Sequence, residues 1–153
     1  MTEGLRLRLA VTDDTDAVTE LAQRSFSRYV DVIGRRPMPM DLDYRRHIEA
    51  ADTWVALEPD HGELIGFIVL VPEPEAIEVD VLAVDPRWQG HGVGSRLLDL
   101  AEERAIAAGK PRLTLYTNES MTENLTWYPT RGFVETRRGE QDGYQRVWFV
   151  KEL

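Results

Sequence analysis

Three closely spaced glycines form the most informative segment of the sequence, Val84-Asp-Pro-Arg-Trp-Gln-Gly-His-Gly-Val-Gly-Ser95. Glycine adopts backbone conformations closed to residues with a Cβ, so Gly90, Gly92 and Gly94 allow a tight turn. The turn lies between a β-branched strand and an amphipathic helix, and it brings several N–H groups to the positive end of the helix dipole. Such a loop binds an anion without a basic side chain. The segment therefore predicts a site for a phosphate-bearing ligand.

The residues after the glycines argue against two common phosphate-binding loops. A Walker loop ends in Gly-Lys-[Ser/Thr], whereas Gly94 is followed by Ser95 and Arg96. A dinucleotide fingerprint beginning at Gly90 would need glycine at position 95, and it would follow the first strand of a βαβ unit. This loop follows the fourth expected strand. A nucleotide-binding protein is therefore disfavoured, and a plain strand-to-helix turn would need only two glycines.

A second motif lies further along the chain, Asn124-Leu-Thr-Trp-Tyr-Pro-Thr-Arg-Gly-Phe133. Together with Gln89-x-x-Gly-x-Gly94, which follows a strand ending in Val84-Asp-Pro86, it resembles the paired elements of the GNAT superfamily of acetyl-CoA-dependent N-acetyltransferases. The resemblance spans the whole chain. It implies transfer of the acetyl group of acetyl-CoA to a primary amine by direct attack in a ternary complex. The alternative is a non-catalytic acyl-CoA-binding sensor or interaction module.

The resemblance also implies where acetyl-CoA, or CoA, binds as cosubstrate. Backbone amides from Gln89 to Ser95 would hold the pyrophosphate, and the pantetheine arm would lie between the strand ending at Val84 and the strand 113–117. Asn124 is a candidate CoA contact, although the family more often has its asparagine further upstream, and a helix cap is the alternative. The expected cofactor-binding residues are Leu82, Ala83, Val84, Gln89, Gly90, His91, Gly92, Val93, Gly94, Ser95 and Asn124.

Direct acetyl transfer requires a base and a proton donor, because an ammonium with a pKa of about 10 has no lone pair. Tyr128 is the expected donor to the leaving thiolate, as the resemblance implies; a tyrosine packed beside Phe133 is the alternative. Pro129 disfavours helical geometry at Tyr128. Glu78 and Asp80 lie on one face of a strand and are the candidate bases, with a solvated carboxylate as the alternative for each.

By the resemblance, the acceptor is recognised by residues 29–44 and by the last hairpin at 137–144. The first segment carries an apolar and basic run, Arg35-Arg-Pro-Met-Pro-Met40, which forms either a lid or a cover for the core. Glu75, together with the two candidate bases, favours a cationic amine. The expected acceptor is a small molecule or peptide with a primary amine.

Composition limits the other partners. The chain has 153 residues, a formal charge of −9 and no cysteine, and its pI is near 4.8. This acidity argues against nucleic acid and anionic membranes as partners. The absence of cysteine excludes disulfides and a protein thiol nucleophile, and no spacing of metal ligands appears, so no metal is expected. We expect a single domain over 1–153, located in the cytoplasm because no targeting or membrane segment is visible; the resemblance is compatible with a homodimer.

Hydrophobic periodicity supplies the elements that position these residues. Strands are expected near 5–11, 54–57, 64–71, 77–84, 113–117, 133–136 and 144–150, and helices near 17–26, 42–49, 97–108 and 122–131. Asp41 is expected to cap the second helix, and Pro72 to end the third strand. The order predicts an α/β (α+β) fold, with a single mixed, mostly antiparallel sheet of about seven strands flanked by helices. The resemblance implies a GNAT-like acyltransferase fold.

Overall fold

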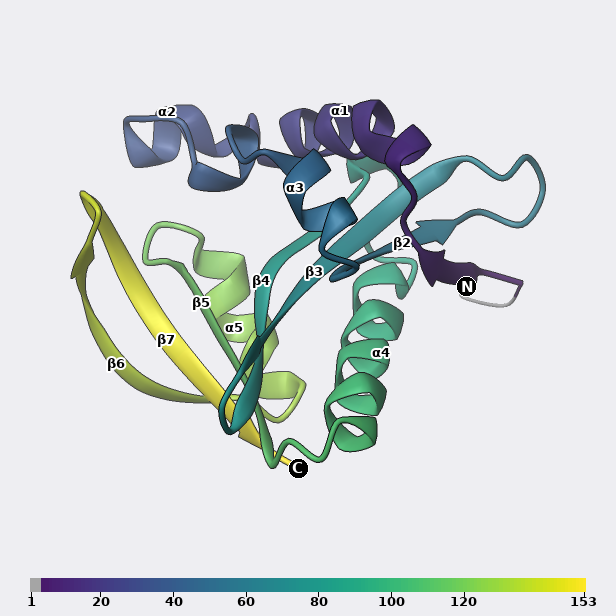
Figure 1. The fold of residues 1–153 in the computed structure, drawn as a ribbon. Coiled ribbons are helices and arrows are strands. Elements are labelled where there is room, and N and C mark those ends of the chain that lie inside the picture. The colour runs from purple at the N-terminus through teal and green to yellow at the C-terminus, as the bar shows by residue number, and fades with distance from the viewer. Residues whose placement is uncertain (1–3) are drawn as a thin grey trace. The chain divides into compact units, whose positions relative to one another are not determined.

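A computed structural model describes residues 4–153, which contain seven strands in the hydrogen-bonded order β1-β2-β3-β4-β5-β7-β6 (Figure 1). The pairs β1–β2, β2–β3, β5–β7 and β6–β7 are antiparallel, and β4–β5 is parallel. The predicted mixed, mostly antiparallel sheet is confirmed. The chain divides into two compact units, one formed by residues up to 70 with 81–99 and the other by 71–80 with 100–153. The expectation of a single domain over 1–153 stays a prediction.

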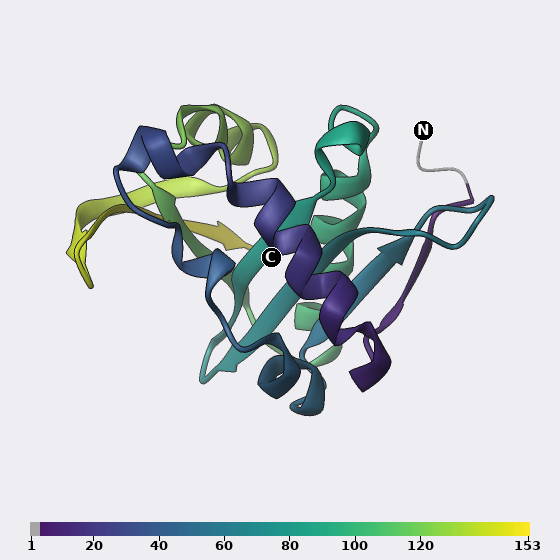
Figure 2. The ribbon, with the colours of Figure 1, turned by 90° about the horizontal axis from the view of Figure 1, so that it is seen from above.

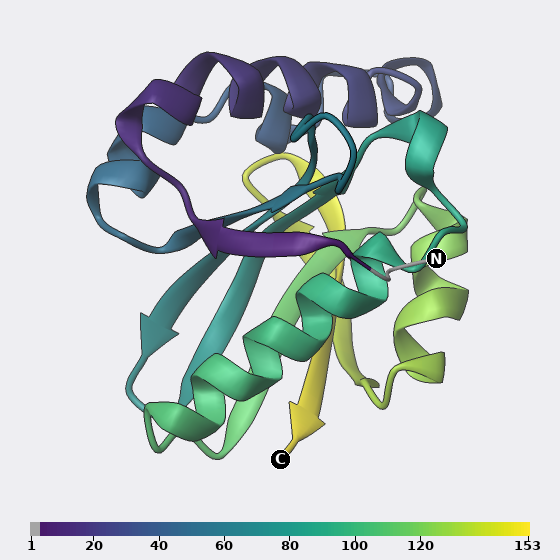
Figure 3. The ribbon, with the colours of Figure 1, turned by 90° about the vertical axis from the view of Figure 1, so that its right-hand side faces the viewer.

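The first unit is built on β1 (Arg6–Leu9), β2 (Thr53–Leu57), most of β3 (Leu64–Glu73) and the second half of β4 (Ala76–Val84). Its helices are η1 (Thr12–Asp14), α1 (Thr15–Phe26), α2 (Tyr29–Ile33), η2 (Met38–Met40), α3 (Tyr44–Glu49), η3 (Pro86–Trp88) and the beginning of α4 (Val93–Ala107). Within this unit α1 crosses β3 and the end of β4 (Figure 2). The beginning of α4 lies on the opposite side of these strands (Figure 3).

Close packing in the first unit brings α4 against β3. A Cβ on Gly66 of β3 would lie 3.0 Å from Val93 and 3.2 Å from Leu97, both on α4. On α1, Val18 and Leu21 are fully buried. The glycine loop before α4 therefore starts from a packed strand and ends in a packed helix, which fixes both of its ends.

The second unit contains the first half of β4, most of α4, β5 (Arg112–Asn118), α5 (Thr122–Thr130), β6 (Val134–Gln141) and β7 (Tyr144–Glu152). The parallel register pairs Glu78 of β4 with Thr114 of β5. Along β4 and β5, buried residues alternate with half-buried ones, so each strand has one face in the core and one more accessible face. Glu78 and Asp80 lie on the more accessible face, as the spacing predicts.

Three local expectations are corrected. The cap of α3 is Asp43, whose carboxylate accepts from the Arg46 N–H, whereas Asp41 pairs with Arg36 at 2.9 Å. Pro72 does not end β3, which continues to Glu73. The short helix α2 was not expected, because its five residues show too little periodicity to register. Among the described residues, no helix is both long and apolar enough to span a membrane.

Candidate active site

The glycine loop in the first unit has the backbone geometry that the sequence predicts at two of its three glycines. Gly90 has φ +82° and Gly92 has φ +84°, a region that side chains with a Cβ rarely adopt. Gly94 instead lies in the first turn of α4, where the first helical bond runs from the Arg96 N–H to the Gly92 carbonyl at 3.0 Å. The first turn of a helix carries N–H groups with no acceptor one turn earlier. The loop thus leads into a helix N-terminus, the kind of backbone arrangement that can bind an anion.

The side chains in and beside the glycine loop differ in their burial and in their contacts. Val93 and Ala83 are 1% and 2% exposed, so they can offer only backbone groups. The side-chain oxygen of Gln89 accepts from Arg28 Nη1 at 3.4 Å. The ring of His91 lies 5.4 Å from that of Trp88 and is exposed. The binding of an anion by the loop backbone stays a prediction from the sequence.

In the second unit, the two candidate bases lie within an acidic group of side chains. The pKa of the half-buried Glu78 carboxyl is raised to about 7, chiefly by burial and then by the charges of Asp80 and Glu73, with Arg146 acting in the opposite direction. Glu73 is held in place by Thr114, whose hydroxyl donates to Glu73 Oε1 at 2.9 Å. A carboxyl with a pKa near neutrality exchanges protons readily at physiological pH, which is what a general base requires.

The sequence analysis missed two residues that act on Glu78: the acidic Glu73 and the basic Arg146. Arg146 is 5% exposed, lies over the ring of Tyr116 at 4.1 Å and bonds to Gln141. Glu75, which precedes β4, pairs with Arg112 at 3.5 Å and is largely exposed. Recognising Glu73 would have required the continuation of β3 through a proline, which is tolerated at certain sheet positions.

Tyr128, the expected proton donor, lies on α5 among aromatic rings. Its ring centroid is 5.6 Å from that of Phe133 and 5.9 Å from that of Phe149. Burial raises the pKa of its phenol above the ordinary value, so the hydroxyl stays protonated at neutral pH. The residue as a whole is only 7% exposed.

Asn124 lies on α5, where its side chain ties the helix to β5. Its Nδ2 donates to Thr117 Oγ1 at 3.0 Å and contacts Met121 Sδ at 3.6 Å. Met121, and not Asn124, is the cap residue of α5. The amide nitrogen is occupied within the protein, so the carbonyl oxygen is the group that this side chain could offer to a ligand.

Residues 35–40 were expected to form either a lid or a cover for the core. The structure places the members of this run differently. Met40 is 5% exposed and belongs to the core of the first unit, while Met38 is exposed. Arg36 Nη2 donates to Gln23 of α1 at 3.1 Å, which ties the segment to that helix. Among residues 4–153, no group of three His, Asp or Glu side chains is arranged to hold a metal ion.

Comparison with known proteins identifies the class. Residues 15–133 match the model of the acetyltransferase (GNAT) family, and the chain belongs to that family. It is 38% identical over 81 residues to mycothiol acetyltransferase of Jonesia denitrificans, covering 52% of this chain and 26% of that protein. It is 36% identical over 92 residues to peptidyl-lysine N-acetyltransferase YjaB of Salmonella typhimurium, covering 60% and 57% respectively. The chain therefore spans about a quarter and just over half of these two relatives.

A solved structure shows the same fold. The PaiA N-acetyltransferase from Thermoplasma acidophilum, in complex with coenzyme A, has a TM-score of 0.80 and 20% identity, covering 97% of this chain and 99% of that chain. The expected GNAT-like fold and the resemblance to the family are both confirmed. The loop residues and Leu82–Val84 belong to the first unit, and Glu78, Asp80, Asn124 and Tyr128 to the second.

Proposed function

We propose that this protein is an N-acetyltransferase that moves the acetyl group of acetyl-CoA to a primary amine by direct attack in a ternary complex. The observation that carries the proposal is the glycine loop. Its two positive φ angles at Gly90 and Gly92 lead into α4 and form a cradle that a Cβ would distort. In a chain of formal charge −9, backbone amides are a way to hold a polyanionic cosubstrate. When bound, acetyl-CoA supplies an acyl group activated as a thioester.

Each group of the protein then has a separate task. The amides from Gln89 to Ser95 bind the pyrophosphate, and the backbone at Leu82 and Val84 binds the pantetheine arm and polarises the carbonyl. Glu78 takes the proton of the acceptor ammonium, directly or through a water, with Asp80 as the alternative base. Tyr128 donates to the sulfur as it leaves.

A cationic acceptor fits the charges around the base. Glu73, Glu78 and Asp80 place negative charge on one face, offset in part by Arg146. The name of the relative YjaB specifies peptidyl-lysine as its substrate, so a lysine-containing peptide is the first acceptor to test. The cytoplasmic location and the homodimer remain predictions from the sequence.

The proposal is tested by thiol release from acetyl-CoA over a panel of amines: a lysine peptide, free amino acids and a polyamine. A thiol-reactive dye reads CoA directly, because the protein has no cysteine to give a background. We expect turnover with at least one amine. Thermal stabilisation by acetyl-CoA without turnover on any amine would favour the acyl-CoA-binding sensor instead.

Replacing Tyr128 with phenylalanine is expected to lower kcat by about tenfold or more, the value of one hydrogen bond to a charged group. The dissociation constant of acetyl-CoA and the thermal stability should change little, because the ring keeps its packing against Phe133 and Phe149. Steady-state kinetics and calorimetric titration measure the two effects. An unchanged kcat would assign Tyr128 to packing alone.

A further inference from the structure

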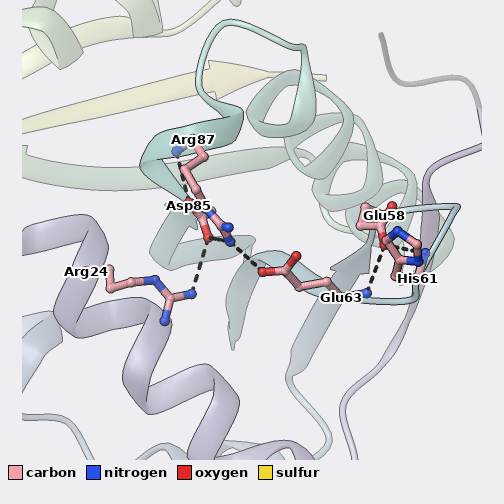
Figure 4. Close-up of polar contacts among 6 residues, drawn as sticks. All are labelled: Arg24, Glu58, His61, Glu63, Asp85 and Arg87. Carbon is pink, nitrogen blue, oxygen red and sulfur yellow. Dashed lines mark hydrogen bonds and ion pairs between the residues drawn. The ribbon is translucent and has the colours of Figure 1, made fainter.

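Asp85 lies where β4 passes into the glycine loop, and its carboxylate is bonded on both oxygens (Figure 4). Oδ1 accepts from the backbone N–H of Arg87 at 2.9 Å and from Arg87 Nε at 3.2 Å. Oδ2 accepts from Arg87 Nη2 at 2.9 Å and from Arg24 Nη2 at 3.3 Å. The residue is 1% exposed, although one of these guanidinium groups is largely in solvent. A buried carboxylate with this set of partners is held in one position.

The backbone around Asp85 is held as firmly as its side chain. Its N–H donates to the Ile65 carbonyl of β3 at 2.8 Å, and its carbonyl accepts from the Trp88 N–H at 2.8 Å. One residue earlier, the Ser25 hydroxyl of α1 donates to the Val84 carbonyl at 3.0 Å. The start of the loop is therefore tied to α1 and to β3 within the first unit.

The side chain of Arg87 joins Asp85 to a further carboxylate. Arg87 also donates to Glu63, the residue just before β3 (Figure 4). The guanidinium of Arg87 beside Asp85 lowers the pKa of that carboxyl, which stays ionised throughout the neutral range. A buried charge of this kind is costly if its partners are removed. Ion pairs, as well as backbone hydrogen bonds, thus link the first turn of the loop to β3 and the residue before it.

Glu58 provides a comparison carboxylate in the same unit, joined to Asp85 only indirectly, through Glu63 and Arg87. It is 4% exposed and caps the turn between β2 and β3, where it accepts from the backbone N–H of Asp60. It also accepts from the backbone N–H groups of His61 and Glu63 (Figure 4). Both residues are buried acids that fix a turn through backbone N–H groups. Only Asp85 fixes the turn that leads to Gly90.

We propose that Asp85 is a positioning residue for acetyl-CoA: by anchoring the first turn of the loop to α1 and β3, it sets the direction in which the amides of Gly90 to Gly94 face the pyrophosphate. The inference rests on the proposed function, since it assigns a role in binding the same cosubstrate. Asp85 acts through the loop and does not touch the ligand. Misplacing groups that bind a substrate weakens the complex even when the reacting groups are intact.

The test compares Asp85→Asn with Glu58→Gln. For Asp85→Asn we expect the dissociation constant and KM of acetyl-CoA to rise about tenfold, with kcat at saturation within about twofold of wild type. Amide hydrogen exchange over 87–92 should accelerate in the free protein. For Glu58→Gln we expect a loss of thermal stability, with acetyl-CoA binding and loop exchange changed much less than in Asp85→Asn, because its link to the loop is indirect.

Arg24→Gln removes one cationic partner that is itself 46% exposed, so the fold tolerates the change and the test survives if Asp85→Asn does not fold. It should raise the dissociation constant of acetyl-CoA about threefold, less than Asp85→Asn, because Arg87 remains. If wild type binds acetyl-CoA and Asp85→Asn binds it equally well, the role of Asp85 is overturned and the proposed function stands. If wild type binds no acetyl-CoA, the proposed function itself fails.

Discussion

Replacing Glu78 with glutamine is expected to lower kcat for acetyl transfer by about 10²- to 10⁴-fold at pH 7, the usual contribution of a general base. The amide has nearly the shape of the carboxylate but cannot accept a proton. Glu78 lies half-buried on β4, and the loop that we propose to bind acetyl-CoA lies in the other unit. Binding of acetyl-CoA should therefore be kept, and calorimetric titration beside steady-state kinetics separates the two quantities.

The pH profile adds a second signature of Glu78. Because its pKa is raised to about 7, the rate should increase with pH through about 7 as the carboxyl loses its proton. This increase of the rate with pH should be absent from Glu78→Gln. Asp80→Asn and Glu73→Gln each remove a negative charge that raises the pKa of Glu78. Both variants should keep activity, and the increase of their rate with pH should occur at lower pH than in wild type. If instead Asp80→Asn loses the activity and Glu78→Gln keeps it, the base is Asp80.

Stability should change in the opposite sense to activity in Glu78→Gln. The pKa of Glu78 is higher in the folded chain than the ordinary 4.5, so the folded state binds the proton more tightly than the unfolded state. The stabilisation that this proton gives is present below about 4.5 and is lost as the pH rises to about 7. Above that pH the wild type holds a half-buried negative charge, whereas glutamine is neutral at every pH. At pH 8 the variant should be at least as stable as wild type by thermal unfolding, which a variant inactive through misfolding would not be.

The glycine loop was predictable because its conformation depends on residues that are neighbours in the chain. Gly90 and Gly92 fall between a strand and a helix that local periodicity already indicates, and both have the positive φ that glycine permits. Gly94 was grouped with them, yet it lies inside α4. Spacing alone does not distinguish a glycine needed for its φ from one that lies in a helical turn. The motif was therefore found, while the role of its last residue was not.

The acidic face was only partly predictable, because its other members come from distant positions. The period of two on β4 placed Glu78 and Asp80 on one face, as the structure shows. Arg146 belongs to β7, and its effect on Glu78 depends on sheet pairing that no local pattern encodes. Glu73 was lost for a different reason: Pro72 was expected to end a strand that in fact continues. The pKa of Glu78 depends on these long-range neighbours and on burial, so it could not be derived from the sequence.

Replacing Gly90 with alanine is expected to raise the dissociation constant of acetyl-CoA by about 10²-fold, equivalent to losing two hydrogen bonds to a charged group. A Cβ at Gly90 meets no atom within 4 Å, so the alanine is not excluded by contact. Its cost arises from φ +82°, where a residue with a Cβ is strained by about 1–2 kcal/mol. The backbone relieves that strain by rotating, and the loop amides then turn away from the pyrophosphate.

Gly109 supplies the matched control for this strain, because it also has a positive φ of +71° and open space around its Cβ, but it follows the end of α4. Gly109→Ala should lower the melting temperature about as much as Gly90→Ala, since the same backbone penalty applies to both. It should leave acetyl-CoA binding unchanged. Equal losses of affinity in the two variants would mean that general destabilisation explains the effect. A loss confined to Gly90→Ala would show that the positive φ of this loop serves the anion, and that a protein of net charge −9 binds its polyanionic cosubstrate through its backbone.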